Sequence, residues 1–268
     1  MRQADSEKFA LLRRCERVWA IASVHGDADR LVALHDQLSG RIHATDRVVY
    51  LGNYMGVGPQ VRAVLDELIE FRRWLLARPR AFAADVVFLR GAQEEMWSKL
   101  LQLQFAPNPP DVLRWLLEHG TAATLQAYGG DPAYATQVAR AGPVAMTRWT
   151  GELRAALAAA PGHQPFISGL RRAAFTDDQA LLFVHAGIDV SRPLGAQSDS
   201  FWWAAGAFGR ITEPYEGFKR VVRGYDAQHA GLVTTPFTTS LDGGCGFGGR
   251  LLAACFDPAG QVIDTLEA

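Results

Sequence analysis

The sequence predicts an α/β fold in which buried strands bring polar residues to one rim of a sheet. The clearest observation is the β-branched apolar run at residues 48–51, followed by a turn-rich loop with Asn53 and an amphipathic helix pattern at residues 61–76. The same order of strand, polar loop and helix recurs after residues 18–22 and 86–89. Because open α/β sheets place their sites at the carboxyl ends of strands, we expect the functional site at this rim.

A fourth strand pattern, at residues 181–184, leads directly into His185.

With 268 residues, the chain can bury a sizeable core in one compact domain. Its composition, 49% hydrophobic and 21% charged, is that of an ordinary globular protein. The net charge of −1 gives no broad attraction to nucleic acid or to an anionic membrane, so neither partner is expected.

Cysteine usage and hydropathy indicate a cytoplasmic protein. The three cysteines, Cys15, Cys245 and Cys255, are an odd number without the spacing of a zinc site, so reduced thiols are expected. No apolar stretch approaches the length of a membrane span. The apolar run at residues 19–24 is too short for the hydrophobic core of a signal peptide and is interpreted as a strand.

The first half of the chain passes from the sheet into a helical region. We expect a short helix or a frayed end before Arg17, and the sheet core from there to Glu95. The prolines and asparagine of residues 105–110 cannot continue a helix. Beyond them, Asp111 is the expected N-cap of a helix that ends at Gly120. Three shorter helices are expected after it, at residues 121–128, 132–141 and 144–159.

The strand pattern returns after Ala180, and its spacing predicts the mostly antiparallel second half of a two-sheet sandwich. The glycine-rich segment 244–249 formally matches G-x-G-x-x-G, but it precedes a strand instead of opening a helix. A tight hairpin therefore explains it better than a dinucleotide-binding loop. The expected strands are centred near Leu182, Val221, Val233, Leu252 and Val262.

Six short motifs follow one another in the order SVHG, GNYMGVGP, RGAQE, HAG, GY and DGGCGFGGRL. This order resembles the calcineurin-like metallophosphoesterases, specifically the branch of bacterial serine/threonine phosphatases and diadenosine tetraphosphatases. The resemblance covers about residues 18–256. It implies a four-layer α/β sandwich, with two mixed β-sheets flanked by helices. It also implies a single domain over residues 1–268, with a helical cap insertion at about 97–172.

The family holds two divalent metals (Mn, Fe or Zn), and the resemblance implies that most of their ligands are substituted here. Ser23 replaces the first-strand aspartate, and Asn53 replaces the aspartate that bridges the two ions. Ala92 replaces an asparagine ligand and Tyr225 a histidine ligand. Two ligands remain, His25 and His185, and in the family they serve different metals. We therefore expect no bound metal, with His25, Asn53 and His185 as the residual candidates.

The resemblance also implies that the catalytic groups are lost. The general-acid histidine of the family corresponds to Gln93, its orienting aspartate to Gly56, and a phosphate-binding arginine to Val57. Because a glutamine has no proton to lend near neutral pH, no residue is assigned a catalytic role. Glu94 matches the family, but it does not perform the chemistry. We expect one pocket to contain Ser23, His25, Asn53, Ala92, Gln93, Glu94, His185 and Tyr225.

These substitutions favour a pseudoenzyme, a phosphatase-like fold kept for binding a small anionic ligand or a protein partner. The alternative is a divergent phosphoester hydrolase that uses a single metal or none, with the remaining polar residues regrouped. A third alternative is a decaying paralogue without a maintained role. The glycines and the Gly248–Leu251 turn are retained while the ligands are not, which favours the first interpretation.

Overall fold

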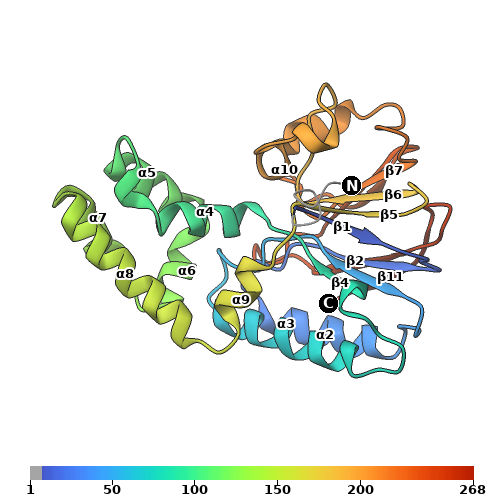
Figure 1. The fold of residues 1–268 in the computed structure, drawn as a ribbon, viewed down its shortest axis with the longest axis horizontal. Coiled ribbons are helices and arrows are strands. Elements are labelled where there is room, and N and C mark those ends of the chain that lie inside the picture. Colours follow the sequence, from blue (N-terminus) through green and yellow to red (C-terminus); the bar gives the residue numbers. More distant parts are fainter. Residues whose placement is uncertain (1–7) are drawn as a thin grey trace.

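The computed structural model describes residues 8–268 as two stacked β-sheets with helices on their outer faces (Figure 1). The five-stranded sheet has the order β11-β10-β2-β3-β4 and the six-stranded sheet the order β1-β5-β6-β7-β9-β8. The first sheet contains β2 (Val18–Ile21), β3 (Arg47–Tyr50), β4 (Val86–Phe88), β10 (Leu252–Phe256) and β11 (Val262–Glu267). The second contains β1 (Phe9–Leu12), β5 (Ala173–Thr176), β6 (Leu181–Val184), β7 (Arg220–Arg223), β8 (Gly231–Thr234) and β9 (Thr238–Asp242).

Helices cover both outer faces of this sandwich, so the predicted α/β sandwich is confirmed. Helices α2 (Ala28–Ser39) and α3 (Val61–Leu76) pack on the five-stranded sheet, and the short α10 (Ser200–Trp203) lies over the other sheet (Figure 1). Between the sheets, the rings of Phe183 and Phe256 meet edge to face at 6.1 Å. Burial of such rings supplies much of the stabilisation of the core.

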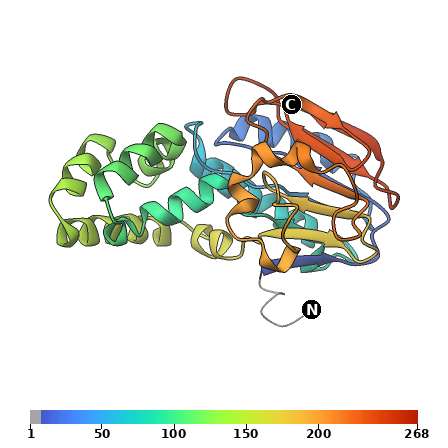
Figure 2. The same ribbon diagram turned by 90° about the horizontal axis from the view of Figure 1, so that it is seen from above.

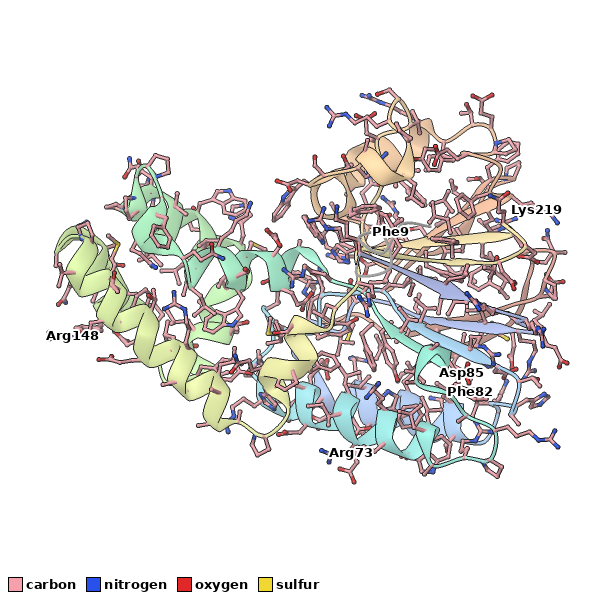
Figure 3. The ribbon with its side chains drawn as sticks, viewed as in Figure 1. Phe9, Arg73, Phe82, Asp85, Arg148 and Lys219 are labelled. Carbon is pink, nitrogen blue, oxygen red and sulfur yellow. The ribbon has the colours of Figure 1, made fainter. Side chains whose placement is uncertain are left out.

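A group of helices extends away from the sandwich (Figures 1 and 2). It is anchored to α3 through His163, whose Nε2 lies 3.0 Å from an Asp66 carboxylate oxygen and whose Nδ1 lies 2.7 Å from the Tyr128 hydroxyl. Figure 3 shows Arg148 on the outer side of this group and Arg73 on the outer side of α3. The group comprises α4 (Ala92–Leu100), α5 (Pro109–Leu116), α6 (Ala122–Ala127), α7 (Pro132–Arg140), α8 (Pro143–Ala159) and α9 (His163–Ser168).

One local prediction in this helical group needs correction. Helix α5 begins at Pro109, after Asn108, and not after an N-cap at Asp111. The reason is that proline is well tolerated in the first turn, where its missing N–H has no partner to lose. The predicted end at Gly120 agrees with the structure, because His119 and Gly120 have non-helical dihedrals (φ of −103° and 100°) within η3 (Leu117–Thr121), and α6 begins beyond this kink.

The segment before Arg17 contains a strand, β1, where a short helix or frayed end was predicted. Residues 1–7 lie outside the described residues. The second sheet is also not mostly antiparallel, because β1–β5, β6–β7 and β7–β9 are all parallel pairs. The glycine-rich loop is tight, with the Arg250 N–H bonded to the Gly243 carbonyl at 2.8 Å, but it joins β9 and β10 of different sheets. Over residues 8–268, no helix is both long and apolar enough to cross a membrane.

Candidate functional site

The loops that follow several central strands meet at one rim of the sandwich and are joined by backbone hydrogen bonds. The Asn53 carbonyl accepts from the N–H of His25 at 2.7 Å. The His185 carbonyl accepts from the N–H groups of Gly224 and Tyr225, each at 3.0 Å. These bonds link the loops after β2, β3, β6 and β7, which is why residues far apart in the sequence become neighbours.

The structure brings the expected pocket residues together, but it packs them against one another. Apart from Tyr225, which is half-buried, each is at most 7% exposed. The rings of Tyr225 and His185 are stacked, with centroids 5.6 Å apart, and the His25 ring lies 6.0 Å from Tyr225. The other members of this buried group are Ser23, Asn53, Ala92, Gln93 and Glu94.

The Asn53 side chain is fixed by two hydrogen bonds, one at each end of its amide. Its Oδ1 accepts from the backbone N–H of Gln93 at 2.9 Å. Its Nδ2 therefore faces the Nε2 of His25, at 3.2 Å. Because Nδ2 can only donate, His25 Nε2 must be the acceptor and the ring proton must sit on Nδ1. The Gln93 N–H thus sets the tautomer of His25 through the Asn53 amide.

The other buried imidazole keeps one free lone pair. His185 Nδ1 donates to the Leu51 carbonyl at 2.7 Å, which leaves Nε2 unprotonated. Both this Nε2 and the Nδ1–H of His25 are buried without a hydrogen-bond partner. Burial lowers the pKa of His185 to about 4 and, together with the nearby imidazoles of His185 and His229, lowers the pKa of His25 to about 3. Both rings are therefore uncharged at pH 7.

Glu94 is the only pocket carboxylate among the expected residues, and its oxygens are used by the backbone. Oε1 accepts from the N–H groups of Tyr54 and Met55, at 2.8 and 3.2 Å. Oε2 accepts from those of Asn53 and Gly91, at 3.0 and 2.8 Å. Burial raises the pKa of Glu94, whereas these four N–H groups lower it. The side chain therefore holds the Asn53 loop against the start of α4 and does not face a ligand.

Gln93, which corresponds to the family's general acid, makes a structural bond to the helical group. Its Nε2 donates to the carbonyl of His119 at 2.8 Å. Its side chain also lies over Gly56, so closely that a Cβ at residue 56 would fall 2.1 Å from Oε1 of Gln93. Gly56 and Gln93 are therefore matched to each other, because an aspartate at residue 56 would occupy the same space.

Two further hydrogen bonds join the loop after β3 to the helical group. The N–H of Val57 donates to the carbonyl of Gly120 at 3.1 Å, and the N–H of Gly56 donates to Oγ1 of Thr124 at 3.0 Å. Gly120 is required here, since a Cβ would lie 3.0 Å from both Val57 and Gln93. The helical group consequently rests directly on the rim.

The two remaining expected residues have simple roles. Ser23 Oγ donates to the Gly224 carbonyl at 2.9 Å. Ala92 is 7% exposed and offers only a methyl group as the first residue of α4. The hydroxyl proton of Ser23 is therefore used, and Ala92 has no polar side-chain atom.

The sequence analysis missed three residues at the same rim. Asp242 is 1% exposed, and its Oδ2 accepts from His229 Nδ1 at 3.0 Å. The His229 ring lies 4.6 Å from the ring of Phe247, which in turn lies 5.1 Å from His25. Two clues were present in the sequence: His229 follows Tyr225 by four residues, and Asp242 opens the closing glycine-rich motif.

Backbone strain is concentrated at this rim. Of the eight non-glycine residues with positive φ in the described chain, four lie here: His25 (52°), Asn53 (55°), Val57 (57°) and His229 (50°). Left-handed backbone is unfavourable for L-residues and especially for a β-branched side chain such as valine. Because such strain clusters at functional sites, it supports the rim as the site of function.

The side chains at the rim do not supply the donors of a two-metal centre. The Asn53 and Gln93 amides are neutral, as are the two imidazoles, and the buried acceptor atoms left without a partner among them are His185 Nε2 and Gln93 Oε1. The oxygens of Asp242 are occupied by His229 and by the N–H groups of Asp226 and Gly244. Among residues 8–268, no group of three or more histidine, cysteine, aspartate or glutamate side chains could hold a metal ion. The donor set therefore does not fit the family's metals.

The two mixed sheets and their polar rim define a class of phosphatase folds, the calcineurin-like metallophosphoesterase sandwich, and the predicted resemblance is confirmed for the fold. A protein assigned as a diadenosine tetraphosphatase has a similar structure, with a TM-score of 0.56 and 19% identity over 97% of this chain and 98% of that chain. A serine/threonine phosphatase from Saccharomyces cerevisiae, similar to human phosphatase PP5, has a TM-score of 0.53 and 12% identity over 97% and 82%.

A third similar structure is the cold-active protein-tyrosine phosphatase of a psychrophilic Shewanella species. Its TM-score is 0.51, with 15% identity over 98% of this chain and 84% of that chain. The sequence itself matches no family model and no curated protein. At such low identities the structural similarity establishes the fold and leaves the activity to be argued from the site.

Proposed function

We propose that this protein is a metallophosphoesterase-fold pseudoenzyme that acts in binding or regulation and does not hydrolyse phosphoesters by two-metal chemistry. The observation that carries the proposal is the orientation of the Asn53 amide between the Gln93 N–H and His25. By the predicted resemblance Asn53 corresponds to the bridging aspartate, so an NH₂ group stands in for one of its carboxylate oxygens. It also engages the lone pair that His25 would give to a metal.

Electrostatics supports the same conclusion. Two divalent ions 3.5–4 Å apart repel each other by roughly 17–19 kcal/mol at an effective dielectric constant of about 20. A bridging carboxylate offsets part of this repulsion, and a neutral amide offsets very little. Gln93 adds a second obstacle, because its side chain is bonded to the His119 carbonyl and has no acidic proton.

We infer that the binding partner is a protein and not a small anion held at the rim. Both imidazoles are neutral at pH 7 because burial lowers the pKa of each. At the start of α4 the N–H of Gly91 is bonded to Glu94 and that of Gln93 to Asn53, so these two donors are not open to an anion. Titration with phosphate followed by the Asn53 side-chain NMR signal should show no shift at millimolar concentration. A saturable shift there would instead support the small anionic ligand.

Elemental analysis tests the proposal most directly. Protein purified with added manganese should contain far less than one manganese, iron or zinc per chain, because the expected rim residues leave only two neutral acceptor atoms without a partner, His185 Nε2 and Gln93 Oε1. About one tightly held ion per chain, lost in His185→Ala, would contradict the proposal. It would favour a single-metal hydrolase.

Hydrolysis of p-nitrophenyl phosphate, its bis-ester and diadenosine tetraphosphate should equal the background rate. The single change Asn53→Asp should not restore turnover, since groups that act as a unit are strongly non-additive. A combined Ser23→Asp, Asn53→Asp, Ala92→Asn, Gln93→His and Tyr225→His variant is the matched comparison. Strong activity from the single change would show that the other substitutions matter little.

A divergent hydrolase using a single metal or none is the second candidate, and one observation favours it. The His229–Asp242 pair lies beside the His185–Tyr225 stack, with the His229 and Tyr225 rings 6.2 Å apart. An imidazole oriented by a buried carboxylate is suited to act as a general base. Phosphoester hydrolysis that survives repurification and is abolished by His229→Gln, but not by the exposed-residue change His43→Gln, would establish this candidate instead.

A further inference from the structure

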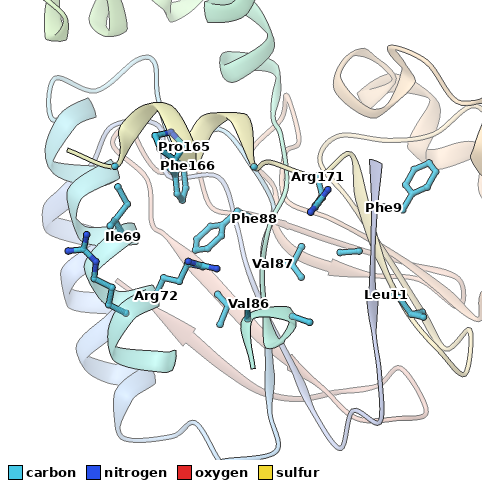
Figure 4. A pocket seen from close by; sticks show the side chains of 16 residues that line it. Phe9, Leu11, Ile69, Arg72, Val86, Val87, Phe88, Pro165, Phe166 and Arg171 are labelled. Atoms are coloured by element: carbon cyan, nitrogen blue, oxygen red, sulfur yellow. The ribbon is translucent and has the colours of Figure 1, made fainter. Parts of the chain in front are cut away.

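A cavity of about 550 Å³ lies away from the rim, at the side of the sandwich where the edge strands of the two sheets approach each other (Figure 4). Strand β4 is the edge of the five-stranded sheet, and β1 is the edge of the six-stranded sheet. Residues of β4, β1, α3 and α9 line the cavity. This volume is within the range of sites that bind small molecules.

Most of the cavity wall is apolar. Val86, Val87 and Phe88 of β4 face it, with Phe166 of α9 above them and Ile69 of α3 at the side (Figure 4). Such a lining favours a ligand with a hydrocarbon body, because burial of each methylene is favourable.

The same wall carries positively charged side chains, of which Arg72 matters most here. Three arginines line the cavity, Arg72, Arg73 and Arg171, and no aspartate or glutamate of the described residues does so. Arg72 is half-buried and points from α3 toward Phe88 (Figure 4). The nearby Asp85 carboxylate is paired with Arg47 at 3.1 Å and does not line the cavity.

Arg72 has no hydrogen bond or ion pair with any residue of the described chain. A guanidinium at an apolar wall lacks the water contacts of an exposed one, so an anionic group beside it would be held by charge-assisted hydrogen bonds. We propose that this cavity binds an anionic amphiphile, a carboxylate attached to an unbranched or aryl apolar body. The carboxylate meets Arg72, and the apolar body lies between Phe88, Phe166 and Ile69.

The cavity wall is connected to the rim through one side chain. The Tyr54 ring packs against Phe88 and Phe166, at centroid distances of 6.1 and 5.5 Å. Its hydroxyl donates to the Leu89 carbonyl at 2.8 Å, and it follows Asn53 directly in the chain. The proposal does not depend on whether the rim is catalytic.

Calorimetric titration of the full chain with decanoate, below micelle-forming concentrations, tests the proposal. We expect one site per chain, with an affinity that falls about fourfold for each methylene removed on going to octanoate. Decan-1-ol should bind at least about tenfold more weakly than decanoate, because it lacks the charge that meets Arg72. Equal affinities for the alcohol and the acid, or no saturable binding, would overturn the proposal.

Three variants locate the binding. Arg72→Gln should remove the preference for decanoate over decanol, whereas Arg62→Gln, an exposed arginine on the same helix outside the cavity, should retain it. Ala84→Trp should fill the cavity and abolish binding of both ligands. Unfolding curves establish that each variant is folded. Binding that is unchanged in Arg72→Gln or in Ala84→Trp would place the ligand elsewhere and refute the assignment.

Discussion

The rim and the cavity beside β1 and β4 differ in how their polar groups are satisfied. At the rim, Asn53, Gln93 and Glu94 bond to one another's backbone or to the helical group, and the side chains are buried. In the cavity, a half-buried arginine, Arg72, faces apolar side chains and has no partner in the described chain.

This difference implies that the rim contributes strongly to the stability of the fold, whereas Arg72 in the cavity contributes little. Groups that satisfy each other hold a fold together, and removing one leaves its partner buried and unpaired. A partly exposed side chain without a partner, such as Arg72, adds little to stability and is available to a ligand. In this protein the rim residues are part of the buried structural core, while a binding volume lies elsewhere.

Glu94→Gln should give the largest loss of stability. It is the strongest test of the idea that the rim residues stabilise the fold by hydrogen-bonding to one another. The amide has one acceptor oxygen for four N–H donors, and its NH₂ group would face two of them. We expect a loss of roughly 4 kcal/mol in unfolding free energy, measured by urea denaturation. Glu95→Gln, which affects a partly exposed pair with Arg90, should cost at most about 1 kcal/mol. Similar losses of stability in Glu94→Gln and Glu95→Gln would show that the four hydrogen bonds of Glu94 are not especially important to the fold.

Acid should destabilise the rim through its two neutral imidazoles. The folded pKa values of about 3 for His25 and about 4 for His185 lie below the unfolded value of about 6.5. Their contribution is therefore complete above the unfolded pKa and is lost as pH falls toward 4, at roughly 1.4 kcal/mol per pH unit for each. Chemical denaturation at pH 7 and 5.5 should differ by roughly 3 kcal/mol from these residues. His185→Asn should reduce this pH dependence by about half, and an unchanged slope would be inconsistent with a buried neutral ring.

Gly56→Ala should test the match between Gly56 and Gln93. The new Cβ would lie 2.1 Å from Gln93 Oε1, at a φ of 79°, so we expect a loss of about 2–3 kcal/mol. Gln93→Ala introduced in the same chain should recover part of it, as a double-mutant cycle would measure. Gly206→Ala has open space around the new methyl and should cost less than about 1 kcal/mol. Additive effects at residues 56 and 93 would mean that the two are not coupled.

Arg72→Leu should produce the smallest change in stability. This variant tests whether the cavity arginine contributes to the fold. Since Arg72 has no partner within the described chain, we expect the unfolding free energy to change by less than about 1 kcal/mol. Thermal or urea unfolding without added ligand is the appropriate measurement. A loss comparable to that of Glu94→Gln would show that Arg72 belongs to the structural framework.

Much of the fold could be predicted because each central strand has its own local pattern. The runs that became β3 and β6 are apolar, short and followed by polar or glycine residues. Strands β1 and β5 were missed because their pairing, Phe9 with Ala173, joins segments distant in the chain. The alanines at residues 173 and 174 also give a weak strand preference. Parallel pairing in the second sheet was missed for the same reason, since periodicity does not reveal a strand's neighbour.

The positions of the candidate site residues could be anticipated more readily than their interactions. Strand-end placement was enough to expect Asn53, His185 and Tyr225 near each other, and they are. The bond from Gln93 to His119 could not be anticipated, because it depends on the left-handed turn at Gly120. It also required the helical group to rest on the rim, which no local sequence pattern specifies.

Tyr54 gives the molecule a route by which the two regions can communicate. It stands between Phe88 and Phe166 on one side and the Asn53 loop on the other. An occupant that immobilises those phenylalanines would also restrict Tyr54 and thereby alter the loop offered to a partner. Such linkage is reciprocal, so a partner bound at the rim would equally change the affinity for the occupant. If the proposed amphiphile binds, Tyr54 would thus couple its binding to the conformation of the Asn53 loop.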